Sequence, residues 1–80
     1  MRLDKYLKVS RLIKRRTVAN EACDAGKVLV NGKVARASCD IKVDDVIVIT
    51  MGMRELKAQV VSVQDTVAKS DAALLYKLLP

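Results

Sequence analysis

The chain has 80 residues, of which 51% are hydrophobic, and its 15 Lys and Arg outnumber its 9 Asp and Glu, for a net charge of +6. This length supports one small domain, residues 1–80, and is too short for an elaborate catalytic cleft. With no apolar run of membrane-span length and no histidine, we expect no membrane span, no secretory signal and no metal site, in a protein of the cytoplasm.

The first third of the chain predicts two helices. Leu3, Tyr6 and Leu7 recur at helical spacing, which predicts a first helix that ends near Val9. After a basic connector, residues 16–26 predict a second helix that ends where Gly26 can adopt a left-handed conformation. Its apolar face consists of small residues: Val18, Ala19, Ala22, Cys23 and Ala25.

The remainder predicts an antiparallel sheet and a last helix. Asn31 and Gly32 suit a type I′ turn between strands at 27–30 and 33–36. Two more strands are predicted at 46–50 and 56–63, and residues 71–79 predict a short helix with these side chains inward: Leu74, Leu75, Leu78 and Leu79. The predicted fold class is α+β: an N-terminal helix pair packed on a small, curved antiparallel β-sheet, with a short C-terminal helix.

Positive charge is concentrated in the first half. Residues 1–42 hold eleven Lys or Arg and four acidic residues, whereas residues 43–80 hold four and five. Such asymmetry is typical of a protein that binds a polyanion. The candidate RNA-binding residues are Arg2, Lys5, Lys8, Arg11, Lys14, Arg15, Arg16, Lys33 and Arg36.

The aromatic content constrains how RNA would be bound. Only Tyr6 and Tyr76 are aromatic, and Tyr6 lies on the predicted core face of its helix. Proteins that bind single strands stack bases on several exposed rings, so we expect contacts to phosphates and to the shape of folded RNA. Charge alone does not distinguish RNA from DNA. It also fits a solvated surface, or a basic adaptor that docks an acidic protein.

Several residues have structural interpretations beside the functional ones. Arg2 could pair with Asp4, and we expect Asp4 to orient neighbouring basic residues or to cap backbone donors. We expect Thr17 to cap the second helix, and Lys33 and Arg36 could simply keep a hairpin soluble.

No arrangement of residues points to catalysis. Asp44 and Asp45 are adjacent in a predicted turn, and neither Cys23 nor Cys39 has a candidate base. We therefore expect two small buried thiols, no cofactor and no enzyme activity.

A series of motifs resembles the ribosomal S-four RNA-binding domain, also called the alpha-L motif. That family reads roughly RLDxxL, SRxxA, Gly, VxVNG and VxxGDxI. The matching residues are Arg2, Leu3, Asp4, Leu7, Arg16, Ala19, Gly26, Val28, Val30, Asn31, Gly32, Ile41, Asp45 and Ile47. The resemblance implies that Arg2 and Arg16 face RNA.

Two positions depart from the family pattern. Arg15 replaces the usual Ser, so the ordinary N-cap acceptor of the second helix is missing. Asp44 replaces the Gly of the Gly-Asp turn, and Asp is one of the few other residues that tolerate left-handed geometry. We expect the turn to survive.

The stretch KVSRLIKRRT, in a chain of this length, resembles the free-standing RqcP family of bacterial ribosome-associated quality control more than the related heat-shock proteins. The resemblance implies these partners: rRNA of the large ribosomal subunit, P-site peptidyl-tRNA, and the tailing factor RqcH on the same particle. It implies a monomeric factor without catalytic activity that steadies the tRNA during alanine tailing.

Overall fold

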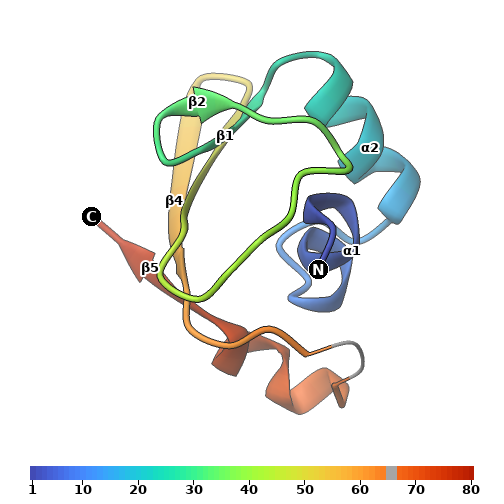
Figure 1. The fold of residues 1–80 in the computed structure, drawn as a ribbon, viewed down its shortest axis with the longest axis vertical. Helices are drawn as coiled ribbons and strands as arrows, with labels where there is room; N and C mark the ends of the chain where they lie inside the picture. The colour runs from blue at the N-terminus through green and yellow to red at the C-terminus, as the bar shows by residue number, and fades with distance from the viewer. Residues whose placement is uncertain (65–66) are drawn as a thin grey trace.

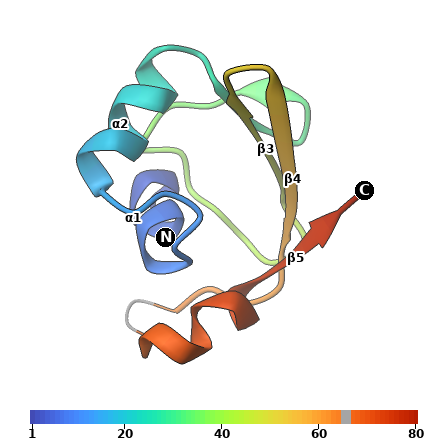
Figure 2. The same ribbon diagram turned by 180° about the vertical axis from the view of Figure 1, so that it is seen from behind.

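A curved antiparallel sheet carries the two N-terminal helices on one side (Figure 1). The computed structural model describes residues 1–64 and 67–80. Its elements are α1 (Leu3–Val9), α2 (Arg16–Asp24), β1 (Val28–Val30), β2 (Lys33–Val34), β3 (Val46–Met51), β4 (Arg54–Val60), the 3-10 helix η1 (Lys69–Leu75) and β5 (Tyr76–Leu79). The strand order is β2-β1-β3-β4-β5, and the view from behind shows the same separation of helices and sheet (Figure 2). The predicted fold class is confirmed.

The second helix begins at Arg16, as predicted, and ends at Asp24, with Gly26 as the left-handed cap that the sequence predicts. Gly26 has φ +74, its N–H donates to the Cys23 carbonyl, and the next N–H, of Lys27, donates to Ala22, which is a Schellman cap. At the other end Arg15 occupies the N-cap position without a side-chain hydrogen bond. Thr17 lies inside the first turn, so the prediction that it caps the helix is wrong.

The small-residue face of α2 is narrower than predicted. Ala19 and Cys23 are buried, whereas Val18 and Ala25 are exposed. A surface helix buries only the stripe that faces its neighbour, and the outer members of the predicted face therefore lie in solvent.

Two tight turns fix the sheet. Asn31 (φ 53) and Gly32 (φ 84) turn the chain between β1 and β2, as the type I′ prediction requires. Asp44 has φ 78, so it takes over the conformation of the glycine that the family pattern has there. The Asp45 carboxylate accepts hydrogen bonds from the Lys42 N–H at 2.9 Å and from the Asn31 side chain at 3.0 Å. Asp45 is architectural, as expected.

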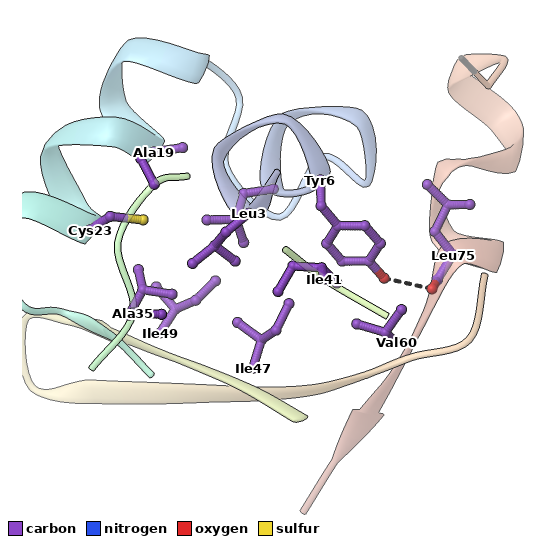
Figure 3. Close-up of a cluster of buried hydrophobic side chains, with 13 residues drawn as sticks. Leu3, Tyr6, Ala19, Cys23, Ala35, Ile41, Ile47, Ile49, Val60 and Leu75 are labelled. Carbon is purple, nitrogen blue, oxygen red and sulfur yellow. Dashed lines mark hydrogen bonds between the residues drawn. The ribbon is translucent and has the colours of Figure 1, made fainter. Parts of the chain in front are cut away.

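The core lies between α1 and the concave face of the sheet (Figure 3). Tyr6 is fully buried and its hydroxyl donates a 2.6 Å hydrogen bond to the carbonyl of Leu75. Leu3 points from the same helix toward the sheet, where it meets Ile47 and Ile49 (Figure 3). The prediction that Tyr6 belongs to the core, and not to an RNA-stacking platform, is confirmed.

The prediction for the C-terminus is wrong over its second half. The chain forms η1 only to Leu75 and then continues as strand β5, which pairs with β4 in a register that sets Tyr76 opposite Val60. Of the four leucines predicted to face inward, Leu75 is buried, while Leu74 is 68% and Leu78 is 58% exposed. The edge of β4 needs hydrogen-bond partners, and this non-local pairing outweighs the local helical spacing of the leucines.

One buried charge joins α1 to α2. The Asp4 side chain is 2% exposed and accepts hydrogen bonds from the side chains of Arg2, Arg16 and Asn20 and from the Lys5 N–H. Burial alone would raise the pKa of Asp4, but the hydrogen bonds from Arg16, Arg2 and Lys5 outweigh it and bring the pKa below its ordinary value. Asp4 orients basic residues, as expected.

The Tyr6 hydroxyl predicts a measurable loss of stability in Tyr6→Phe. This variant loses one buried hydrogen bond, so its free energy of unfolding in urea should fall by about 0.5–1.5 kcal/mol. Tyr76→Phe is the matched control, because the Tyr76 hydroxyl makes no hydrogen bond within residues 1–64 and 67–80. Equal stabilities for the two variants would contradict this role of Tyr6.

The Asp4 network predicts a defined loss of stability in acid. Because the folded-state pKa lies below the ordinary 3.8, the stabilisation is fully present above that pH and is lost as the pH falls through the folded-state value. The stability advantage of the wild type over Asp4→Asn should therefore be constant from neutral pH to about pH 5 and shrink below pH 3.8. Urea titrations at a series of pH values measure it, and an advantage that grows in acid would contradict the network.

Candidate nucleic-acid interface

A groove of about 550 Å³ separates α2 from the segment that follows the β1–β2 hairpin. Arg2 and Arg36 both line it, although they are far apart in the sequence. Backbone hydrogen bonds explain their proximity: the Leu3 N–H donates to the Cys39 carbonyl at 2.8 Å and the Asp4 N–H to the Ala37 carbonyl at 3.1 Å. These bonds hold the start of α1, next to Arg2, against the segment that carries Arg36.

Two smaller hollows share lining residues with this groove. One is lined by Arg16 and shares Asn20 with the groove. The other, beside the hairpin, is lined by Lys33 and shares Arg36. Four of the nine predicted RNA-binding residues thus line this groove or a hollow that shares residues with it, which together we call the basic groove: Arg16, Arg2, Arg36 and Lys33.

The other five candidates do not line the basic groove. Lys5 and Lys8 lie on the face of α1 that points away from the core, by their helical spacing from the buried Leu3 and Leu7. The remaining three, Arg11, Lys14 and Arg15, are exposed in the connector before α2. Their contacts with RNA stay a prediction.

The two arginines expected to face RNA also bind the buried Asp4. Arg2 Nε lies 3.2 Å from Asp4 Oδ1, and Arg16 Nε lies 3.2 Å from Asp4 Oδ2. The pairing considered for Arg2 on sequence grounds is therefore real, and it extends to Arg16. Their side chains nevertheless remain 52% and 46% exposed, so an ion pair with Asp4 leaves each guanidinium accessible.

The basic groove also contains polar and acidic side chains. Asn20 and Ser38 line it beside Asp24, and Glu21 lines the hollow next to Arg16. Sequence reasoning missed Asn20 and Ser38. Asn20 follows Arg16 by four residues, which places both on the same face of α2 and would have indicated it; no comparable signal marks Ser38.

The two cysteines differ in their exposure. Cys23 and Cys39 are both free, and Cys23 is buried while Cys39 is only partly so, which corrects the expectation of two buried thiols. Burial raises the pKa of the Cys23 thiol to about 11, so it stays protonated at neutral pH.

Neither a metal nor a membrane has an evident site in the described part of the chain. Within residues 1–64 and 67–80, acidic and cysteine side chains nowhere gather in a group of three that would hold a metal ion. Across the same residues every helix is too short or too polar to cross a bilayer.

Comparisons with known proteins identify the family of the chain. The S4 domain family model matches residues 1–47. The chain is 51% identical to the "RQC P-site tRNA stabilizing factor" of Streptococcus pneumoniae, over 99% of this chain and 90% of that protein. The Bacillus subtilis protein of the same name is 48% identical over 99% of this chain and 92% of its own.

A solved structure extends the likeness to the whole fold. The trimeric structure of Vibrio cholerae heat shock protein 15 superposes with a TM-score of 0.90 at 29% identity, covering 99% of this chain and 81% of that one. From the domain match and the near-complete alignment with these relatives, it follows that the chain belongs to the S4 domain family and, within it, to the family of RQC P-site tRNA stabilizing factors.

Proposed function

We propose that this protein is a non-catalytic RNA-binding factor of ribosome-associated quality control. It binds the obstructed large ribosomal subunit and stabilises peptidyl-tRNA in the P site while RqcH adds alanines. Residues 1–80 act as one RNA-binding domain, monomeric and cytoplasmic, on the ribosomal particle. The observation that carries this proposal is the 51% identity, over 99% of the chain, to a protein named for stabilising P-site tRNA in this process.

The basic groove supplies a physical basis for holding RNA. Its four cations lie on a surface with few aromatic groups, so phosphates and RNA shape are the features it fits. Three of the four groove cations are arginines, and a planar guanidinium can donate two parallel hydrogen bonds to the oxygens of one phosphate. Binding of this kind steadies a tRNA or an rRNA stem without making or breaking a bond.

A second candidate function is recycling of large subunits, as a heat-shock-type factor. The TM-score of 0.90 with heat shock protein 15 of Vibrio cholerae favours it. That chain is 29% identical to this one, whereas the tRNA-stabilising relatives are 51% and 48% identical to it. We therefore prefer tRNA stabilisation.

Phosphate binding predicts a steep salt dependence of RNA affinity. If the four groove cations each neutralise one phosphate, the slope of log affinity for a structured RNA against log salt should be about −3 to −4. Arg36→Ala should weaken binding and make that slope shallower by about 1. Arg36 is the residue of choice because its exposed side chain forms no ion pair within residues 1–64 and 67–80, so the variant should keep its melting temperature.

The matched control for this variant is Arg54→Ala. Arg54 is exposed at the start of β4 and does not line the basic groove. Filter-binding or fluorescence titrations over a range of salt concentrations give both slopes. A flat salt response of the wild type, or equal losses for the two variants, would contradict RNA binding by the basic groove.

The quality-control role predicts the particle with which the protein sediments. In sucrose gradients of cell extracts, the tagged protein should comigrate with large subunits that carry peptidyl-tRNA, and this fraction should increase when translation stalls. The recycling function predicts the same particles but no dependence of alanine tailing on the protein.

Deletion of the gene, followed by detection of alanine tails on a stalled reporter, separates the two functions. Loss of tails supports tRNA stabilisation. Recovery of the protein with a soluble acidic partner, and not with large subunits, would contradict both functions and favour a protein adaptor.

A further inference from the structure

The buried carboxylate of Asp4 brings two guanidinium groups to one point of the basic groove. Arg2 donates from Nε to Oδ1 at 3.2 Å and from Nη2 to Oδ2 at 3.3 Å. Arg16 donates from Nε to Oδ2 at 3.2 Å and from Nη2 to Oδ1 at 3.5 Å. Arg2 immediately precedes α1 and Arg16 is the first residue of α2. Both arginines use the same edge of the guanidinium for the same two oxygens.

This geometry leaves the other edge of each arginine free to bind a ligand. A guanidinium carries five N–H donors, and Asp4 occupies one on Nε and one on Nη2. In the part of the chain that the structure describes, Nη1 of both arginines is without a hydrogen bond. The edge formed by Nη1 and Nη2 is the one that binds a phosphate end-on with two parallel hydrogen bonds.

The carboxylate makes this close placement of two cations possible. Two guanidiniums that approach one point repel each other, and the charge of Asp4 offsets that repulsion while the cluster keeps a net positive charge. Long side chains also lose conformational freedom when they bind, and arginines already fixed by Asp4 lose less of it. Asn20, which donates to Asp4 Oδ2 at 3.4 Å, holds the carboxylate itself from α2.

We propose that Asp4 is a positioning residue for RNA binding, which sets Arg2 and Arg16 as a paired clamp for two neighbouring phosphates of a folded RNA. This inference rests on the proposed RNA-binding function. It specifies the ligand that Arg2 and Arg16 bind, a pair of RNA phosphates. The prediction that follows is opposite to the one from charge alone. From charge alone, removal of the Asp4 carboxylate should strengthen binding of a polyanion. If Asp4 positions the two arginines, its removal should weaken binding.

The test compares Asp4→Asn with Asp24→Asn, using a synthetic RNA stem-loop as the probe. Asp24 also lines the groove, and its side chain makes no hydrogen bond within residues 1–64 and 67–80. Because it removes a negative charge from the groove, Asp24→Asn should bind the stem-loop more tightly than the wild type. Asp4→Asn should bind about tenfold more weakly, since two arginines must then be ordered on binding. Circular dichroism at the assay temperature establishes that both variants are folded.

A double-mutant cycle then shows whether Asp4 acts through Arg16. If it does, Arg16→Ala costs much less affinity in the Asp4→Asn background than in the wild type. Should Asp4→Asn fail to fold, Arg16→Lys replaces it: a lysine keeps the charge but lacks the fork, so it should weaken binding while the protein stays folded.

The outcomes separate this inference from the proposed function. Wild-type binding that depends steeply on salt, together with tighter binding by a folded Asp4→Asn, would overturn the positioning role and leave RNA binding intact. The positioning role would also be overturned if Asp4→Asn and Arg16→Ala lowered RNA affinity independently, so that their factors multiply in the double variant. Binding by Arg16→Lys as tight as that of the wild type would overturn it too. Absence of stem-loop binding by the wild type would remove the proposed function itself.

Discussion

The carboxylate of Asp4 is the interaction on which the arrangement of the basic groove depends. A buried charge is costly unless it is hydrogen-bonded and paired, and Asp4 meets that condition with donors from Arg2, Arg16, Asn20 and the Lys5 backbone. The same bonds that offset its desolvation determine where the two arginines lie. The Asp4 carboxylate therefore contributes to the stability of the fold and also positions the positive charges of Arg2 and Arg16.

Contacts of α1 fix the segment that carries Arg36 relative to Arg2. Tyr6 anchors α1 through its contact with Leu75, and Leu3 binds the 36–41 segment through its backbone N–H. Because that segment carries Arg36, the position of Arg36 relative to Arg2 is set by backbone hydrogen bonds and not by flexible side chains. A rigid scaffold of this kind suits the recognition of RNA shape, in which the spacing of phosphates is the feature that is read.

The parts of the fold that follow from local sequence were predictable. The type I′ turn at Asn31-Gly32, the left-handed Gly26 and the apolar spacing of α1 each depend on residues close together in the chain. The C-terminal strand was not predictable from local sequence, because the leucines from Leu74 to Leu79 have helical spacing. Only pairing with the edge of β4, distant in the sequence, makes a strand more favourable.

The candidate site was predictable in composition but not in arrangement. Family positions and charge identified Arg2 and Arg16, and charge identified Lys33 and Arg36. Nothing in the spacing of Asp4 and Arg16, twelve positions apart, showed that one carboxylate would bind both arginines, because that contact depends on how α1 and α2 pack. The same packing separates the four groove cations from Lys8 and the connector residues, which composition alone treats alike.

The most direct test of the account is an NMR titration of the labelled protein with an RNA stem-loop. We expect the backbone signals of Asn20, Arg36 and Ser38 to shift together with the side-chain Nε signals of Arg2 and Arg16. Strands β4 and β5 lie at the opposite edge of the sheet from the β1–β2 hairpin, so their signals should not shift. Shifts confined to β4 and β5, or unchanged Nε signals of Arg2 and Arg16 at saturating RNA, would contradict the account.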